Sequence, residues 1–202
     1  MRSPALVMAL AVGLTSGARP ASGTPTAPAA LPPAGERVTE GAPLPPFALP
    51  VLNPGAGRAT FDTRDTAGAP LVLSFVASHC GPCKREVPAL LAALAGHPEV
   101  RVALVVVDRE EDGREAERRW LVEELAVAVP VLADRFGLVG RRYGVDELPM
   151  VVVAGPDGAT RLVARGFHPD SVARVVAALG LSPAPPPVPT PEPAAPGRRS
   201  RP

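Results

Sequence analysis

Short runs of apolar residues recur through the middle of the chain and indicate buried strands. The first run, residues 71–76, combines β-branched, aliphatic and aromatic side chains, as a strand covered on both faces does. Four further runs are expected to form strands, at residues 101–107, 127–132, 150–154 and 160–165.

Between these runs, the apolar residues follow a helical period. Val87, Leu90, Leu91 and Leu94 fall at i, i+3, i+4 and i+7, so they occupy one face of a helix that ends near Gly96. Three more helices are expected, at about residues 113–125, at residues 136–142 and from Pro169 to Gly180.

The predicted order of elements is βαβαβαββα. Alternating strands and helices favour parallel crossover connections, whereas the turn Gly155-Pro156-Asp157-Gly158 joins the last two strands as an antiparallel hairpin. The sequence therefore predicts an α/β fold with a mixed central β-sheet and helices on both faces.

Proline sets the two ends of the chain apart from this middle region. Of 28 prolines, ten lie in residues 1–50 and nine in residues 183–202. Residues 1–18 place Arg2 before an apolar run and small residues, the order of a secretory signal peptide. We expect a signal peptide at 1–18, or a short membrane anchor if it is not cleaved. A disordered linker at 19–46, a folded domain at 47–181 and a disordered tail at 182–202 complete the expected organisation.

The composition removes several functional classes. The formal net charge is +1, with 21 basic and 20 acidic residues scattered along the chain, so nothing favours nucleic acid as a partner. Two cysteines and three histidines exclude a multi-metal scaffold and a disulfide-dense mini-protein. Export would place both cysteines in a periplasmic or other extracytoplasmic compartment where disulfides persist.

The candidate chemistry lies in Cys80-Gly81-Pro82-Cys83, between the first buried strand and the first helix. Cysteines at i and i+3 lie one helical turn apart, so their sulfurs can reach bonding distance. Cys80 is expected at the helix start, where unpaired N–H groups and the helix dipole favour a thiolate. We therefore expect Cys80 to attack a substrate disulfide and the more shielded Cys83 to resolve the mixed disulfide.

Three other uses of this cysteine pair are a zinc site, a structural disulfide and peroxidase chemistry. A zinc site needs two more ligands, and His79, His97 and His168 are scattered along the chain. A purely structural disulfide across so short a loop removes little entropy from the unfolded chain. Peroxidase chemistry ordinarily requires a threonine three residues before the nucleophile, and that position holds Ala77.

Several residues near the pair carry expectations of their own. Glu86 shares a helical face with Cys83, so its carboxylate can exchange a proton during resolution, although a surface position is the alternative. Lys84 and Arg85 are most simply solvated charges, and Trp120 is a helix packing residue.

Residues 74–83, SFVASHCGPC, and the following Glu86-Val87-Pro88 resemble the exported thioredoxin-fold reductases of the TlpA and ResA type. The likeness spans residues 45–179 and implies a thioredoxin-like fold. It also implies a cis Leu148-Pro149 bond that faces the disulfide, with the Leu148 backbone offered to an extended substrate strand. Gly81 and Pro82 complete the motif, and Glu86 matches a glutamate associated with proton transfer.

Two departures from the family qualify these roles. His79 replaces the usual tryptophan before the first cysteine, so either an imidazolium lowers the pKa of Cys80 and makes the pair more oxidising, or the ring points into solvent. Ser74 stands where cytosolic thioredoxins carry a buried aspartate, which leaves Glu86 as the evident substitute.

The sequence thus predicts an exported thiol-disulfide oxidoreductase that reduces protein disulfides without a bound cofactor. Its expected partners are substrate protein disulfides and a membrane or exported electron-donor thiol protein, with cytochrome c maturation as one conceivable pathway by resemblance. A monomer is the default expectation. The alternatives are a metal-binding or metal-delivery module that uses Cys80, Cys83 and His79, and a net disulfide oxidant.

Overall fold

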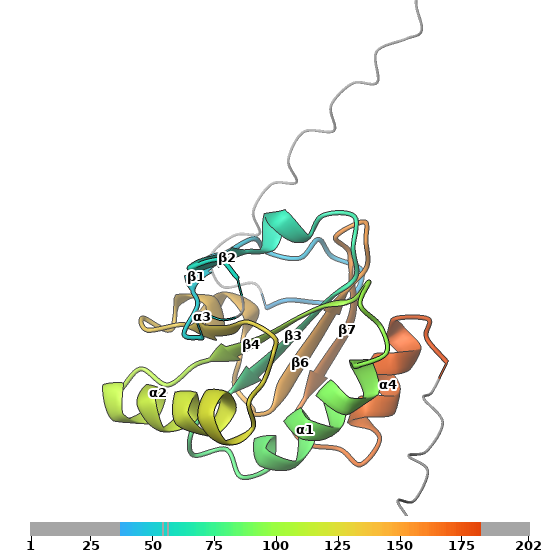
Figure 1. Cartoon of the computed structure of the whole chain (residues 1–202). Coiled ribbons are helices and arrows are strands. Elements are labelled where there is room, and N and C mark those ends of the chain that lie inside the picture. The colour runs from blue at the N-terminus through green and yellow to red at the C-terminus, as the bar shows by residue number, and fades with distance from the viewer. Residues whose placement is uncertain (1–36, 54, 56, 183–202) are drawn as a thin grey trace, which may run out of the picture. The chain divides into compact units, whose positions relative to one another are not determined.

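The computed structural model describes residues 37–53, 55 and 57–182. A five-stranded sheet with the order β5-β4-β3-β6-β7 lies at its centre (Figure 1). Strands β3, β4 and β5 run parallel, whereas β6 runs antiparallel to its neighbours β3 and β7. This confirms the mixed central β-sheet that the sequence predicts. Its strands are β3 (Leu71–Val76), β4 (Arg101–Val106), β5 (Val131–Ala133), β6 (Met150–Ala154) and β7 (Thr160–Arg165).

The helices alternate with the strands in the predicted order. Helix α2 continues into η3, a π-helical segment, and together they account for the single helix expected at residues 113–125. The helical segments are α1 (Cys83–Leu94), α2 (Glu111–Arg118), η3 (Arg119–Glu124), α3 (Leu138–Tyr143) and α4 (Ser171–Ala178).

Alternate side chains of β3 point to opposite faces of the sheet, and each face has its own apolar cluster. Val72 and Val76 pack with apolar residues of α1, α4 and η3. Leu73 and Phe75 pack on the other face against α3 and the hairpin formed by β1 (Ala48–Pro50) and β2 (Thr60–Asp62). Both faces of the sheet are therefore covered, which explains why its strands read as continuous apolar runs.

Two parts of the sheet differ from the sequence prediction. Strand β5 begins at Val131, not at residue 127, because Ala126 has a positive φ of 50° and Pro130 has no N–H to donate. The Asn53 side chain bonds Val129 O at 2.9 Å and Val131 N at 2.9 Å in place of a longer ladder. The β1–β2 hairpin was not predicted, because its three-residue strands are too short to show an alternating pattern.

The expected linker boundary at residue 46 is also wrong. Residues 37–46 pack on the domain, where Val38 is 4% exposed and Pro43 bridges to Ala159 at the start of β7. The N–H groups of Gly41 and Leu44 donate to Thr160 O and Gly158 O, each at 2.8 Å. The sequence did not predict that residues 37–46 belong to the folded domain, because the segment is rich in proline and has no apolar periodicity. Hydrogen bonds of its backbone attach it to the edge of the sheet.

The predicted signal peptide at 1–18, most of the linker at 19–46 and nearly all of the tail at 182–202 lie outside the described residues. Among the residues that the structure describes, no helix has the length and apolar character needed to span a membrane.

Candidate redox site

The redox motif lies where β3 ends and α1 begins. The Cys80 and Cys83 sulfurs form a disulfide, with the two Cα atoms 5.3 Å apart. Because β3 and β4 are parallel and both have a crossover helix next, this edge of the sheet collects the loops that follow the strands. The motif therefore occupies the place where open α/β sheets put reactive groups.

The two cysteines have different surroundings. Helix α1 starts at Cys83 with Pro82 as its N-cap, so Cys80 lies just before the helix. The Cys83 N–H donates to the Cys80 sulfur at 3.2 Å, a contact that favours a thiolate over a thiol. Cys80 retains 5% of its exposed area, whereas Cys83 is fully buried. This difference agrees with the expected order of attack, in which Cys80 reacts first.

The Leu148-Pro149 bond is cis, as the resemblance implied. Leu148 is half-buried and packs against the apolar cluster that contains Cys80 and Cys83. Pro149 is buried directly before β6, whose first residue, Met150, pairs with Phe75 near the end of β3. Gly81 is exposed at the tip of the motif, with nothing near its Cα that a side chain would meet.

Glu86 is a buried residue, so the alternative of a surface helix glutamate is wrong. Its exposed fraction is 3%, and its Oε2 has no hydrogen-bond partner among the described residues. Burial raises the pKa of the Glu86 carboxyl, and Ser171 and His168 at the start of α4 oppose that rise. Ser74 is also fully buried, and its hydroxyl has no hydrogen-bond partner in the part of the chain that the structure describes. The face of β3 beneath α1 therefore carries a hydroxyl, not a carboxylate, at this position.

His79 points largely into solvent, with 77% of its side chain exposed. Its Nδ1 lies 3.7 Å from Oδ1 of Asp108, which is two residues beyond the end of β4. Asp108 accepts hydrogen bonds from Ser78 N at 2.9 Å and Ser78 Oγ at 2.8 Å. Asp108 thus ties the loop before Cys80 to the end of β4, a link that the sequence pattern did not reveal.

The sequence also did not predict a cluster of Lys84, Glu117 and Trp120 next to Cys83. Lys84 Nζ donates to Glu117 Oε2 at 3.0 Å and lies 3.5 Å from the centroid of the Trp120 ring. The expectation that Lys84 is simply solvated is therefore wrong. Arg85 is exposed, with its guanidinium 4.9 Å from the centroid of the Phe167 ring. The only sequence signal for the cluster was the position of Lys84 next to Cys83.

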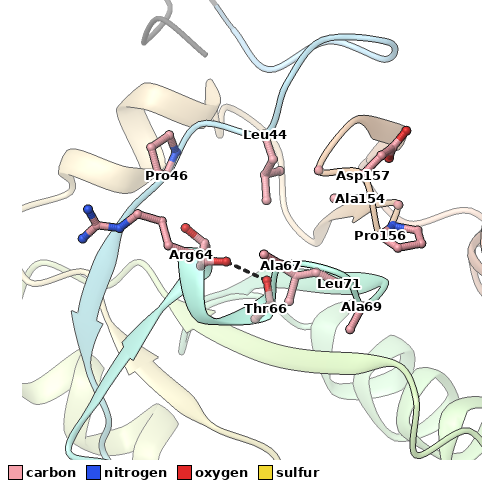
Figure 2. A pocket seen from close by; sticks show the side chains of 13 residues that line it. Leu44, Pro46, Arg64, Thr66, Ala67, Ala69, Leu71, Ala154, Pro156 and Asp157 are labelled. Atoms are coloured by element: carbon pink, nitrogen blue, oxygen red, sulfur yellow. Dashed lines mark hydrogen bonds between the residues drawn. The ribbon is translucent and has the colours of Figure 1, made fainter. Parts of the chain in front are cut away.

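A separate hollow of about 220 Å³ lies at the opposite end of the strands (Figure 2). Its lining includes Leu71, the first residue of β3, and Ala154, the last residue of β6. Arg64 and Asp157 at its rim are ion-paired with Asp62 at 2.6 Å and Arg161 at 2.7 Å. None of the residues of the redox motif lines this hollow. Within the described part of the chain, no group of three or more His, Cys, Asp or Glu side chains is placed to hold a metal ion.

Comparison with known proteins gives concordant matches. The model of the AhpC/TSA family matches residues 41–163. The thiol-disulfide oxidoreductase ResA of Oceanobacillus iheyensis is 28% identical over 120 residues, which cover 59% of this chain and 62% of the relative. Matches to two further ResA proteins cover 55% of each, so the chain spans less than two thirds of these curated relatives.

Two solved structures extend the comparison. A Chlorobium tepidum protein assigned as a thiol:disulfide interchange protein, DsbE, superposes with a TM-score of 0.59 and 26% identity, over 71% of this chain and 99% of that one. A secreted Mycobacterium tuberculosis disulfide oxidoreductase homologous to E. coli DsbE gives a TM-score of 0.55 and 26% identity, over 66% and 96% of the two chains. These matches confirm the thioredoxin-like fold and the resemblance drawn from the CGPC motif.

Proposed function

Because the chain belongs to the AhpC/TSA family, we propose that it is a thiol-disulfide oxidoreductase that reduces protein disulfides outside the cytoplasm through a reversible Cys80-Cys83 disulfide. The observation that carries the proposal is the pairing of these cysteines at the start of α1, with the Cys80 sulfur accepting the Cys83 N–H at 3.2 Å. The relatives named as thiol-disulfide oxidoreductases support it.

In the reduced protein, the Cys80 thiolate attacks one sulfur of a substrate disulfide and expels the other as a thiolate. The mixed disulfide between Cys80 and the substrate is then attacked by the Cys83 thiolate, which releases the second substrate sulfur. Two electrons pass from the dithiol to the substrate, and the protons of the dithiol end on the two substrate thiols. The Cys80-Cys83 disulfide is restored to a dithiol by an external thiol protein.

Glu86 is the residue to which we assign the proton from Cys83. Cys83 is fully buried and must lose a proton to attack, so an acceptor close to it on α1 is needed. Glu86 lies one turn further along the same helix, is itself buried, and has a pKa raised by burial, which makes it a better base than an ordinary glutamate. Without Glu86, water must accept the proton of Cys83, and this transfer is slower. Loss of Glu86 therefore slows the attack by Cys83 on the mixed disulfide more than the attack by Cys80 on the substrate.

Substrate contact falls to the residues around the disulfide. The Leu148 backbone, held by Pro149 at the edge that carries the motif, pairs with an extended segment of the substrate. Gly81 leaves room for the approaching chain, Pro82 starts α1, and exposed His79 flanks the entry to Cys80. Ala77 is buried three residues before Cys80 and supplies no hydroxyl, which disfavours peroxide as a substrate.

An exported location fits the sequence of residues 1–18 and the secreted M. tuberculosis relative. In such a compartment the substrates are protein disulfides, and the electron donor is a membrane or exported thiol protein. The chemistry itself needs no bound cofactor, because the two sulfurs carry both electrons.

Reduction of insulin disulfides by dithiothreitol tests the proposal. We expect the wild-type protein to accelerate precipitation of the insulin B chain catalytically and Cys80→Ser to lose this activity. The metal content of protein purified in reduced form is measured on the same samples. Stoichiometric zinc or copper together with absent turnover would overturn the proposal in favour of a metal-binding module.

A further inference from the structure

Glu117 is a buried acid that the mechanism above does not use. It lies on α2, none of its surface is exposed, and its Oε1 has no hydrogen-bond partner among the described residues. A buried carboxyl group destabilises a fold unless hydrogen bonds or an opposite charge offset its loss of hydration. An apolar side chain of similar size would avoid that cost. Six of the eight residues of α2 are charged, and Glu117 is the only buried acid among them.

The only hydrogen bond that the Glu117 side chain makes within the described residues connects it to the redox motif. Oε2 accepts from Lys84 Nζ at 3.0 Å, and Lys84 directly follows Cys83 in the first turn of α1. The same ammonium lies 3.5 Å from the centroid of the Trp120 ring, three residues after Glu117. Leu121, one turn beyond Glu117, packs in the cluster that contains Cys80 and Cys83. Trp120 packs against the same cluster, so α2 and its continuation hold the Lys84 ammonium beside the apolar cluster that contains the two cysteines.

We propose that Glu117 is a positioning residue for the redox pair, which fixes the Lys84 ammonium over Trp120 and offsets its charge, and so keeps the dithiol reducing. The proposal rests on the proposed function, because it concerns the reactivity of the same two sulfurs. An isolated ammonium beside the motif would stabilise the Cys80 thiolate, and a stabilised thiolate makes the pair a stronger oxidant. An ammonium that is paired with a carboxylate stabilises the Cys80 thiolate less.

The other charged groups around Glu117 do not replace its effect. Asp108 and His79 face it from the loops after β4 and before Cys80, and Asp108 is already bonded to Ser78. Burial raises the pKa of Glu117, and Lys84 is the strongest influence in the opposite direction. The Lys84 contact is therefore the main influence that favours the ionised form of Glu117, and the two groups act on the redox pair as one unit.

The test compares Glu117→Gln with Glu115→Gln, an exposed glutamate of the same helix that pairs with Arg118. Glutamine keeps the shape of Glu117 and still accepts from Lys84, but it removes the negative charge. We expect Glu117→Gln to raise the rate of Cys80 alkylation by iodoacetamide, below the pKa of the thiol, by about threefold or more. The equilibrium with glutathione should shift toward the dithiol by a similar factor, and Glu115→Gln should match the wild type.

A double variant shows whether the effect passes through Lys84. In Lys84→Met/Glu117→Gln both charges are absent, so alkylation and the glutathione equilibrium should return close to the wild-type values. Unchanged values in Glu117→Gln, or an equal shift in the double variant, would overturn the proposal, even if the stability of either protein changed. Thiol reactivity is measured without a client, so this failure is distinct from an absence of insulin reduction by the wild type.

Discussion

Glu86 combines a near-complete loss of exposure with an oxygen that finds no partner among the described residues. Burial raises the pKa of its carboxyl above the ordinary value of 4.5. The folded protein therefore holds a proton at Glu86 at pH values where the unfolded chain has released it. It follows that the contribution of Glu86 to stability is most favourable at low pH and declines as the pH rises from 4.5 through the folded pKa.

We predict that Glu86→Gln makes the oxidised protein more stable at neutral pH, because burial raises the pKa of Glu86 and glutamine avoids the cost of a buried negative charge. The gain should disappear below the ordinary pKa of a glutamate. Urea unfolding at neutral and acidic pH measures this difference, with exposed Glu124→Gln as a control. A variant that is less stable than the wild type at neutral pH would contradict the assigned cause of the pKa shift.

At the residue scale, the sequence was sufficient for groups that belong to a local motif. The spacing of Cys80 and Cys83 predicted the disulfide, and the likeness to ResA-type proteins predicted the cis bond before Pro149. The role of Glu117 was not predictable, because hydropathy does not distinguish the one buried glutamate of a helix made mostly of charged residues. Only the contact between Glu117 and Lys84 of α1, seen in the structure, makes that distinction.

At the scale of elements, Asp108 joins three of them. It follows β4, accepts two hydrogen bonds from Ser78 in the loop before Cys80, and its backbone oxygen accepts from Arg114 on α2 at 3.3 Å. A Cβ atom on Gly113 of α2 would lie 2.7 Å from Asp108 Oδ1. The close approach of α2 to this carboxylate therefore requires glycine at this position.

We predict that Gly113→Ala destabilises the protein by about 1 kcal/mol or more, although alanine in a helix is ordinarily favoured over glycine by ~1 kcal/mol. The added methyl group displaces Asp108 and weakens its bonds to Ser78, a loss of about 1 kcal/mol for each hydrogen bond. Denaturant unfolding measures the effect. Gly96→Ala, where a methyl group meets nothing, is the control, and a stabilised Gly113→Ala would rule out this explanation.

The elements themselves differ in how well the sequence predicts them. Long apolar runs such as β3 and β4 were correct to within a residue, because a strand buried on both faces needs apolar residues throughout. The beginning of β5 and the β1–β2 hairpin depend instead on Asn53, Pro130 and three-residue pairings. The Asn53 side chain bonds residues 76 and 78 positions away, and the strands of the hairpin have only three residues each, so no local sequence pattern predicts either feature.

At the scale of the whole folded region, residues 37–46 complete the structure by covering the start of β7. The Tyr143 hydroxyl donates to Pro45 O at 2.6 Å, and the ring packs at 5.3 Å from Phe75 and 5.7 Å from Phe47, centroid to centroid. This contact holds the segment against α3, while backbone hydrogen bonds hold it against β7. An edge strand that is covered in this way is less open to pairing with other chains.

We predict that Tyr143→Phe lowers the free energy of unfolding by about 1 to 2 kcal/mol, because a buried carbonyl oxygen loses its donor while the aromatic packing is kept. Insulin reduction should remain at the wild-type rate, since Tyr143 lies on the face of the sheet opposite α1. Thermal unfolding and turnover are measured on the same sample. A loss of turnover without a loss of stability would show that the segment serves the redox site directly.

In the proposed reaction Cys80 attacks the substrate disulfide and Cys83 resolves the mixed disulfide. The most direct measurement expresses Cys80→Ser and Cys83→Ser separately, quenches free thiols with acid and identifies adducts by non-reducing electrophoresis and mass spectrometry. Cys83→Ser should accumulate disulfides between Cys80 and substrate proteins, and Cys80→Ser should accumulate none. Adducts on Cys80→Ser with none on Cys83→Ser would show that Cys83 is the attacking cysteine.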